Sequence, residues 1–373
     1  MMSIKKIFKR VIYLLAVRKC IIFESCPDFS DNPKAVFDEM IKRNLNKKYT
    51  LVWLLFDGHR DKYPKIHGVK YINKGEKVFS FYSATAKCFI CCNRFLFLDN
   101  DYQKSFFLTH GMYVKRPTSY YTLPKQIDYC LSSSPELEKM QAEALNVDGE
   151  KMISLGYPRN DVLTGERLDL SQYFGKGFSK YVVWYPTFRQ HKSGMGTGSS
   201  HSLPIIWDEQ NAKRLNEFAR EHGVLLILKP HFAQDTEKIQ ALNLSNIRFI
   251  NDEFLLDNNL PSYKFVASCD ALITDYSSIY FDYTLCDKPI GLVWEDYDEY
   301  QKEPGFALDM NYYMKGGFKI YNIEEFEKFI EDVAMENDIL RKERREIRDI
   351  SNISTDGKSS ARVVDFIINA VKL

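Results

Sequence analysis

The chain has 373 residues, of which 45% are hydrophobic and 27% are charged, and its formal net charge is +1. This length exceeds one ordinary core and fits two domains, and the near-neutral charge argues against a nucleic acid as the partner. Eight cysteines without a secretory signal favour free thiols in a reducing cytosol. The CxxC pair Cys88 and Cys91 lies in an apolar run with no second pair at zinc spacing, so buried structural thiols are expected there.

The first segment, residues 4–19, has the periodicity of a basic amphipathic helix. At about 100° per residue, one face is basic and the other is apolar. The basic face carries Lys5, Lys6, Lys9 and Arg10, and the apolar face carries Ile4, Ile7, Phe8, Val11 and Leu15. The segment is too short and too charged to span a bilayer. A helix of this kind can lie on an anionic membrane surface, and the alternative is an ordinary surface helix packed on the first domain.

Strand and helix patterns alternate through the first half of the chain. Such alternation at βαβ spacing predicts a parallel sheet that is covered on both faces. Strands are expected at 20–24, 49–56, 69–72, 87–92, 106–108, 127–131 and 152–155, with helices at 30–44, at 75–86 and from residue 134.

The strand at 106–108 runs into Thr109, His110 and Gly111, and Lys115 follows shortly after. A glycine at such a place lets the backbone approach a ligand. A histidine at a strand end can act as a general base, because its unperturbed pKa lies near the operating pH. The alternative is a hydrogen-bonded loop histidine without a chemical role.

A turn rich in Gly and Pro, residues 156–161, carries Arg159 and Asp161. Together with the glycines between 165 and 177, this turn marks a domain boundary. Arg159 is therefore expected near any cleft between the two domains.

The second half repeats the alternation of strands and helices. The strand ends are expected to deliver Arg, Lys, His and hydroxyl side chains to one edge of a parallel sheet, as in nucleotide-diphosphate sites. No GxGxxG or P-loop pattern occurs, which counts against dinucleotide and P-loop sites, and the Ser- and Gly-rich segment 190–203 is expected to be a flexible loop. Strands are expected at 181–184, 224–228, 247–250, 271–273 and 289–294, and helices at 207–222, 262–268, 278–285, 324–348 and 360–371.

The segment 270–283 contains the clearest candidate for a phosphate site. Its turn supplies Thr274, Asp275, Ser277 and Ser278, which are residue types that cap helices. The N-terminus of the following helix offers unpaired N–H groups and a partial positive charge, so it suits a phosphate. The alternative is a well-capped structural helix.

Eight motifs together resemble the CDP-glycerol glycerophosphotransferase family, which contains the teichoic-acid primases and polymerases. The resemblance covers the chain from about residue 20 to the C-terminus, and the ordered set is far more specific than any one motif. The motifs are FESCPDFSDNPKAVF (23–37), THG followed by a lysine (109–115), GYPRND (156–161), YPTFR (185–189), LKPH (228–231), ITDYSSIYFDY (273–283), DKPI (287–290) and DGKSSARVVDFI (356–367).

The resemblance implies an α/β fold with two Rossmann-like domains facing a cleft, the GT-B architecture. We expect a membrane-contact helix at 1–19, an acceptor-side domain at 20–165, a CDP-glycerol-binding domain at 175–355 and a C-terminal helix at 356–373. The resemblance also implies transfer of glycerol phosphate from CDP-glycerol to a hydroxyl of a membrane-linked or polymeric acceptor, with release of CMP, in the synthesis of teichoic-acid or capsule-type polymers.

By position, the resemblance assigns residues to catalysis and to the donor. His110 would take the proton of the acceptor hydroxyl, and His231 would hold the pyrophosphate. Two positions depart from the family pattern: Thr109 stands where a Trp usually precedes the His, with Met112 and Tyr113 after the Gly, and Lys229 replaces an Arg, which keeps the charge but loses the bidentate fork. Donor contacts would come from Gly111, Arg159, Pro186, Thr187, Lys229, Ser277, Ser278 and Asp282, with support from Lys115, Arg189, Thr274 and Asp275.

In-line phosphoryl transfer would leave the protein mainly positioning and charge stabilisation. No carboxylate cluster in the sequence calls for a metal, so no cofactor is required besides the donor CDP-glycerol, although a divalent metal is compatible. The alternatives are a CDP-ribitol phosphotransferase, another GT-B transferase, and a non-catalytic polymer-binding homologue. Because the acceptor is expected to be membrane-tethered, the protein is expected on the anionic inner leaflet, as a peripheral protein of the cytoplasmic face.

Overall fold

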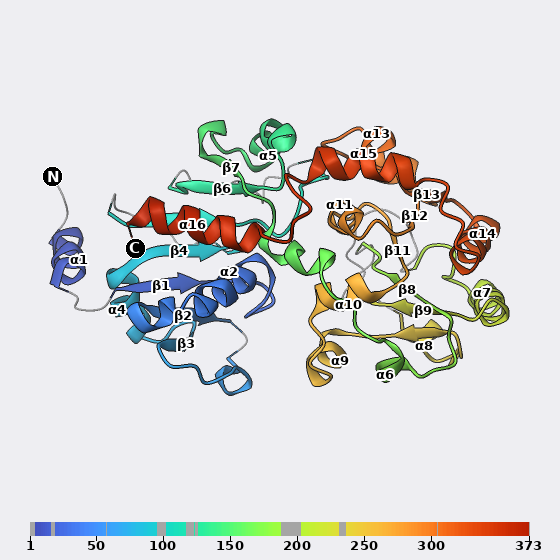
Figure 1. Cartoon of the computed structure of the whole chain (residues 1–373), viewed down its shortest axis with the longest axis horizontal. Helices are drawn as coiled ribbons and strands as arrows, with labels where there is room; N and C mark the ends of the chain where they lie inside the picture. The colour runs from blue at the N-terminus through green and yellow to red at the C-terminus, as the bar shows by residue number, and fades with distance from the viewer. Residues whose placement is uncertain are drawn as a thin grey trace. The chain divides into compact units, whose positions relative to one another are not determined.

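The structure is a computed structural model, and its described part forms two compact units (Figure 1). Unit 1 is built from the described parts of Met1–Met112, Ser119–Asp161 and Asn352–Leu373, and unit 2 from those of Tyr113–Thr118 and Val162–Ser351. The described residues are 4–15, 19–56, 58–94, 102–116, 123, 126–187, 203–230, 236–303 and 305–372.

Unit 1 contains a seven-stranded parallel sheet in the order β3-β2-β1-β4-β5-β6-β7. The strand order reverses between β1 and β4: β2 and β3 lie on one side of β1, and β4 to β7 lie on the other. In open α/β sheets, ligands bind at such a switch point, outside the carboxyl ends of the strands. The strands are β1 (Cys20–Phe23), β2 (Thr50–Leu55), β3 (Val69–Asn73), β4 (Ala86–Cys91), β5 (Lys104–Phe107), β6 (Tyr129–Ser132) and β7 (Met152–Ser154).

Helices cover both faces of this sheet, which is why its central strands are apolar on both sides. On one face α2 (Asp31–Lys42) and α16 (Ser359–Val371) bury apolar side chains against β1, β2 and β4, and on the other α4 (Val78–Thr85) packs with Phe79 and Tyr82 (Figure 1). Cys88, Cys91 and Cys92 are buried, and none of the eight cysteines, all of which the structure describes, forms a disulfide, as expected. The other helices are α1 (Ile4–Leu15), α3 (Leu45–Lys48) and α5 (Glu138–Leu145), and the 3-10 turns are η1 (Arg60–Lys62), η2 (Pro135–Leu137), η3 (Gly149–Lys151) and η4 (Pro158–Thr164).

The C-terminal helix α16 belongs to unit 1, although most of unit 2 precedes it in the chain. The carboxylate of Asp161 accepts the N–H groups of Ser359 and Ser360 at 2.7 and 2.8 Å, so it caps the N-terminus of α16. Gly156 lets the two segments approach: its φ is +79°, and a Cβ there would lie 2.4 Å from the Ser359 hydroxyl oxygen.

Unit 2 contains a six-stranded parallel sheet in the order β10-β9-β8-β11-β12-β13. The prediction of two Rossmann-like domains is therefore confirmed. The strands are β8 (Lys180–Trp184), β9 (Val224–Leu228), β10 (Ile247–Phe249), β11 (Ala271–Thr274), β12 (Ile290–Val293) and β13 (Phe318–Ile320). The helices are α6 (Ser171–Phe174), α7 (Glu209–Glu221), α8 (Glu237–Gln240), α9 (Asp252–Asp257), α10 (Ser262–Ser268), α11 (Ile279–Tyr283) with the turn η5 (Thr284–Cys286), α12 (Tyr297–Lys302), α13 (Met310–Tyr313), α14 (Ile323–Ala334) and α15 (Arg341–Ser351).

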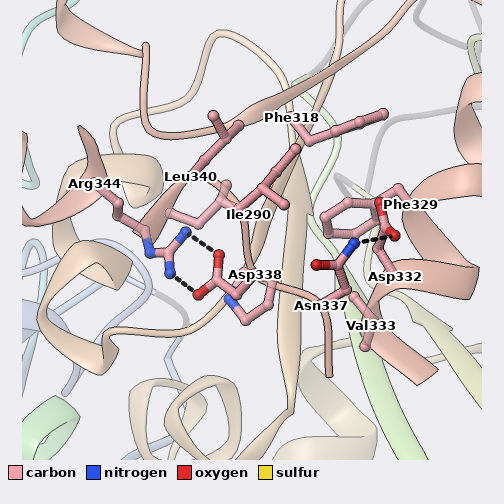
Figure 2. Close-up of a pocket in the computed structure, with 11 residues that line it drawn as sticks. Ile290, Phe318, Phe329, Asp332, Val333, Asn337, Asp338, Leu340 and Arg344 are labelled. Atoms are coloured by element: carbon pink, nitrogen blue, oxygen red, sulfur yellow. Dashed lines mark hydrogen bonds and ion pairs between the residues drawn. The ribbon is translucent and has the colours of Figure 1, made fainter. Parts of the chain in front are cut away.

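The single helix expected at 324–348 is wrong, because α14 and α15 are separate helices. After α14 the chain enters the left-handed region at Glu336 (φ +58°), and the Asn337 N–H bonds back to the Asp332 carbonyl at 2.8 Å. The buried guanidinium of Arg344 then pairs with Asp338 in the connection (Figure 2). A cavity of about 20 Å³ lies here, near the amino ends of β12 and β13, and has room for about one water molecule.

Candidate active site

His110 lies just after β5, at the carboxyl edge of the sheet in unit 1. Its side chain is half-buried, and its Nδ1 lies 3.5 Å from the carbonyl oxygen of Cys92, which follows the neighbouring strand β4. Because a carbonyl oxygen only accepts hydrogen bonds, this contact favours the tautomer that carries its proton on Nδ1 and leaves Nε2 basic.

Burial lowers the pKa of His110, and the nearby charge of Arg159 lowers it further. The carboxylate of Asp31 acts in the opposite direction but does not reverse the shift. The imidazole is therefore neutral at neutral pH, which is the protonation state that a general base requires.

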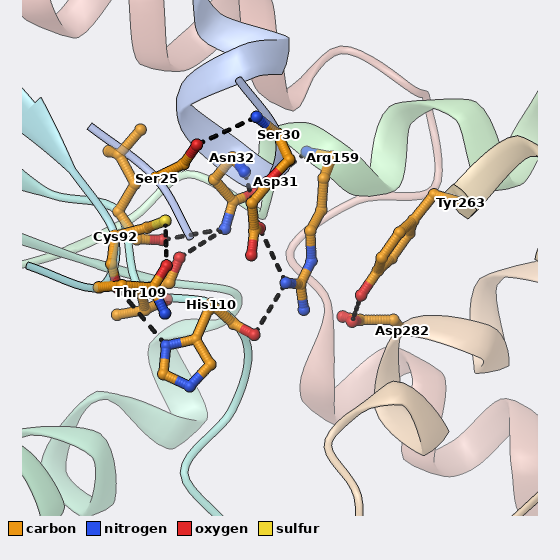
Figure 3. A network of polar contacts seen from close by, with 12 residues as sticks. Ser25, Ser30, Asp31, Asn32, Cys92, Thr109, His110, Arg159, Tyr263 and Asp282 are labelled. Carbon is orange, nitrogen blue, oxygen red and sulfur yellow. Dashed lines mark hydrogen bonds and ion pairs between the residues drawn. The ribbon is translucent and has the colours of Figure 1, made fainter. Parts of the chain in front are cut away.

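Arg159 holds the backbone of the His110 loop. Its Nη1 donates to the carbonyl oxygen of His110 at 2.8 Å and to Oδ1 of Asp31 at 2.8 Å (Figure 3). The Arg159 side chain is only 8% exposed and that of Asp31 13%, so the pair is shielded from salt and water. The structure thus joins His110 and Arg159, which were both predicted site residues, by a direct hydrogen bond, and it adds the carboxylate of Asp31, which was not predicted.

Asn32 is a second residue that the sequence did not identify. Its buried side-chain amide donates to the carbonyl oxygens of Leu108 and Thr109 at 3.0 and 2.9 Å, and its Oδ1 accepts the N–H of Arg159 at 3.0 Å (Figure 3). One side chain therefore ties the start of α2 to the two segments that carry His110 and Arg159. The only sequence signal was its place in the 23–37 motif, where it was interpreted as the start of a helix.

Two residues of this cluster have left-handed backbones. Thr109 has φ +52° and Asp31 has φ +60°. A β-branched residue rarely adopts this conformation, so Thr109 stores strain that its neighbours must hold in place. The hydrogen bond from Asn32 to the Thr109 carbonyl is one such restraint.

Gly111 is buried with φ +126°, a conformation that suits glycine. Lys115, only four residues later, belongs to unit 2, where it forms an isolated antiparallel bridge with Phe306. Its Nζ lies 5.4 Å from the centre of the Tyr300 ring. The predicted supporting role of Lys115 therefore concerns the second unit rather than the loop of His110.

In unit 2, the ends of β8 and β11 are joined by Asp275. Its buried carboxylate accepts the backbone N–H of Thr187 at 2.8 Å, the Thr187 hydroxyl and the N–H of Tyr276 at 2.7 Å. The Thr274 hydroxyl donates to the carbonyl of Tyr185 at 2.9 Å. Thr274 and Asp275 thus shape the turn that carries the buried Pro186 and the half-buried Thr187.

Ser277 and Ser278 lie where β11 turns into α11, and both are half-buried. Ser278 occupies the N-cap position, but its side chain makes no capping hydrogen bond and its backbone is already helical. Their hydroxyls have no hydrogen-bond partner among the residues described, and α11 itself has only five residues. Asp282 is buried one turn later and accepts a hydrogen bond from the Tyr263 hydroxyl at 2.7 Å (Figure 3).

Lys229 follows β9 at the same edge of the sheet. Its Nζ forms an ion pair with Asp252 at 2.8 Å and lies 5.5 Å from the centre of the Tyr185 ring. The side chain is 14% exposed, so it presents a partly shielded positive charge. His231 and Arg189, two further predicted site residues, lie outside the described residues, as does most of the expected loop at 190–203.

Two further properties concern metals and membranes. Within the described ranges, no group of three or more His, Cys, Asp or Glu side chains is placed to hold a metal ion. None of the helices that the structure describes has the length and apolar character needed to cross a bilayer.

Comparison with protein families gives one match that covers nearly the whole chain. Residues 7–369 match the family described as CDP-glycerol:poly(glycerophosphate) glycerophosphotransferase.

Curated relatives carry related names. A teichoic acid poly(glycerol phosphate) polymerase of Bacillus spizizenii is 25% identical over 83% of this chain and 82% of its own length. A teichoic acid glycerol-phosphate transferase of Staphylococcus aureus is 23% identical over 82% of this chain and 84% of its own length. A teichoic acid ribitol-phosphate primase of Bacillus spizizenii is 26% identical, but the match spans only 59% of that protein.

Solved structures show the same fold. The wall teichoic acid polymerase TagF superposes with a TM-score of 0.73 over 98% of this chain and 93% of that chain, at 21% identity. A UDP-N-acetylglucosamine 2-epimerase from Listeria monocytogenes superposes with a TM-score of 0.53 over 95% and 97% of the two chains, at 11% identity. At these identities the likeness concerns the fold alone.

Proposed function

The chain belongs to the CDP-glycerol:poly(glycerophosphate) glycerophosphotransferase family, and we propose that it transfers glycerol phosphate from CDP-glycerol to a hydroxyl of a teichoic-acid or capsule-type polymer. The acceptor oxygen forms a bond to the phosphorus that bears glycerol, and the bond between this phosphorus and the bridging oxygen breaks. CMP leaves with that oxygen, and the acceptor proton passes to the protein.

The observation that carries this proposal is the state of His110. The ring is neutral because burial and Arg159 lower its pKa, and the contact with the Cys92 carbonyl favours a basic Nε2. Nε2 takes the proton of the acceptor hydroxyl as that oxygen attacks phosphorus. Arg159 holds the backbone of His110 through the His110 carbonyl and thereby fixes the direction of the ring.

Unit 2 supplies the donor site in this proposal. Asp275 accepts both the N–H and the hydroxyl of Thr187, so the turn that carries Pro186 and Thr187 keeps one geometry beside the donor. The pyrophosphate accepts hydrogen bonds from the hydroxyls of Ser277 and Ser278. The ammonium group of Lys229 and the side chain of His231 also contact it. Asp282, which accepts a hydrogen bond from Tyr263, contacts the glycerol of the donor. No step is assigned to a metal.

The membrane is the second partner in the proposal. In α1 the side chains of Phe8 and Leu14 are 65% and 68% exposed, and Ile7, Val11 and Arg10 are also exposed. An exposed apolar face beside cationic residues suits the interface of an anionic bilayer. A peripheral protein of this kind reaches a membrane-tethered acceptor while it draws its donor from solution.

The test is a donor panel. Purified protein is incubated with a glycerol phosphate oligomer and CDP-glycerol, CDP-ribitol or a UDP-sugar, and the released nucleotide and the product mass are measured. The proposal expects CMP from CDP-glycerol and a mass increase of one glycerol phosphate unit. The names of three relatives, among them the Bacillus spizizenii primase, make ribitol phosphate the second candidate, and preference for CDP-ribitol would replace CDP-glycerol as the proposed donor.

A further inference from the structure

A second polar cluster lies beside His110 in unit 1 and has no part in the chemistry proposed above. Glu24 directly follows β1, Arg94 follows β4, and Asp28 lies in the loop between β1 and α2. These strand ends flank the point where the order of the sheet reverses, at which α/β sheets bind ligands.

Glu24 is fully buried, and only one of its carboxylate oxygens is satisfied. Oε2 accepts the backbone N–H of Arg94 at 3.0 Å, whereas Oε1 has no hydrogen-bond partner within the described part of the chain. Burial raises the pKa of Glu24, which marks a carboxyl that lacks full compensation. Such unsatisfied buried atoms are rare in folded proteins and indicate a missing polar partner.

The guanidinium of Arg94 faces the unbonded Oε1 of Glu24. Its Nη1 lies 3.7 Å from Glu24 Oε1 and 3.7 Å from Asp28 Oδ1, which is beyond hydrogen-bond length in both cases. Nη1 is shielded from solvent and makes no hydrogen bond within the described residues, so its only compensation there is these two long ion pairs. The guanidinium lies 3.8 Å from the centre of the Phe56 ring, and its side chain is 38% exposed, so Arg94 forms the solvent side of the cluster.

The charges decide which ligand fits. Two carboxylates around one guanidinium leave a net negative charge, which disfavours a phosphate. A hydroxyl fits because it donates to Glu24 Oε1 and accepts from Arg94 Nη1. Both atoms are shielded from solvent, so a hydroxyl reaches them when the partly exposed Arg94 side chain turns outward.

The cluster and His110 converge on one turn. Glu24 bonds to the N–H of Arg94 and His110 contacts the carbonyl of Cys92, and these two turn residues are at most roughly 7 Å apart along the chain. A short polyol bound at this turn can present one hydroxyl to His110 and another to Glu24. The terminal glycerol of a glycerol phosphate chain is such a group.

We propose that Glu24 and Arg94 bind the non-reacting hydroxyl of the acceptor's terminal glycerol and thereby select the acceptor. This inference rests on the proposed function for the identity of the acceptor. Within the 23–37 motif, it assigns Glu24 to acceptor recognition.

The experiment compares two acceptors. One is a short glycerol phosphate oligomer, and the other is the same oligomer whose terminal unit is propane-1,3-diol, which lacks the middle hydroxyl. The native protein is expected to show a KM for the deoxy acceptor roughly 10- to 100-fold higher, the range for a lost hydrogen bond to a charged group. Glu24→Gln should raise the KM for the glycerol acceptor by a similar factor, abolish the preference, and leave the KM for CDP-glycerol unchanged.

Arg94→Lys provides a second test with a side chain outside the core, and it should weaken the same preference. Arg43→Lys is the matched control, because Arg43 pairs with Glu39 and Asp365 in the same unit and should leave both KM values unchanged. Full retention of the preference in Glu24→Gln, or in Arg94→Lys if the first variant does not fold, overturns the proposal. That result would mean that only a water molecule binds between Glu24 and Arg94.

A different measurement separates this inference from the proposed function. If the native protein releases no CMP with either acceptor, the proposed function fails. Calorimetric titration with the glycerol phosphate oligomer alone then tests whether Glu24 and Arg94 bind the acceptor. A lower affinity of Glu24→Gln for the oligomer supports this role. Equal affinity of the variant and the native protein, or no binding by the native protein, overturns it.

Discussion

Asn32→Asp tests whether the network around His110 positions a catalytic base or only stabilises the fold. The variant is nearly isosteric and keeps an oxygen that accepts the Arg159 N–H, but it cannot donate to the carbonyls of Leu108 and Thr109. Each buried carbonyl left without a partner costs about 1–3 kcal/mol, so we expect the free energy of unfolding to fall by about 2–6 kcal/mol. That is a large fraction of the 5–15 kcal/mol typical of a folded protein.

The same variant should also change the pH dependence of catalysis. In the native protein, burial and Arg159 lower the pKa of His110, so the acid limb of kcat/KM should lie below about pH 6.5, the ordinary histidine value. Activity falls as the pH drops through the pKa of the folded protein, because the base becomes protonated. An added carboxylate at position 32 favours the imidazolium, so the limb should move upward by about 1 unit.

Asn246→Asp is the matched control in unit 2. Asn246 is buried and its amide donates to the carbonyl of Val224 at 2.8 Å, so its loss should lower stability in the same way. It should not move the acid limb. The variants would be compared by urea unfolding and by kcat/KM from pH 4.5 to 8; loss of stability in both with no shift in Asn32→Asp would refute the positioning role.

Three further outcomes are expected. His110→Ala and His231→Ala should each lower turnover by at least roughly 100-fold, and only His231→Ala should also weaken donor binding by calorimetry; near-normal turnover in His110→Ala would remove the base. The double variant of Ser277 and Ser278 to Ala should bind CDP-glycerol more weakly, because two unpaired hydroxyls are lost while the backbone N–H groups remain; unchanged affinity would place the phosphate elsewhere. Deletion of residues 1–19 should abolish salt-sensitive pelleting with anionic vesicles while activity on a short soluble acceptor persists; equal pelleting would move the anchor to another surface.

The regular elements could be predicted because they depend on local patterns. Continuous apolar runs such as Val224–Leu228 identified buried parallel strands, and the spacing between runs identified the crossover helices. The helix expected at 324–348 failed because a side-chain bond from Asn337 to Asp332, together with the left-handed Glu336, ends a helix whose charged pattern continues beyond that point.

The site was harder to predict because its polar groups meet across long stretches of chain. His110 and Arg159 were identified by motif. Asn32, which bonds to both of their segments, and Asp31, which pairs with Arg159, come from a segment about 80 residues before His110. Residue type also misled in the opposite direction. Thr274 and Asp275 have the composition of a helix cap, and nothing in the sequence indicated that their side chains also bond to the end of the neighbouring strand β8. No periodicity in one sequence encodes such pairings.

The return of α16 to unit 1 has a consequence for the order of events on the ribosome. Val363, Val364 and Ile367 close the core that Val36 and Phe37 begin, and the last of them emerges after all of unit 2 has been made. Unit 2 is almost continuous in the chain, so it can fold before synthesis ends. The sheet of unit 1 is made earlier, but one of its apolar faces stays partly exposed until α16 has been made. Ribosome stalling or proteolytic loss of the last 15 residues would thus leave the amino-terminal half, and with it the His110 loop, dependent on chaperones.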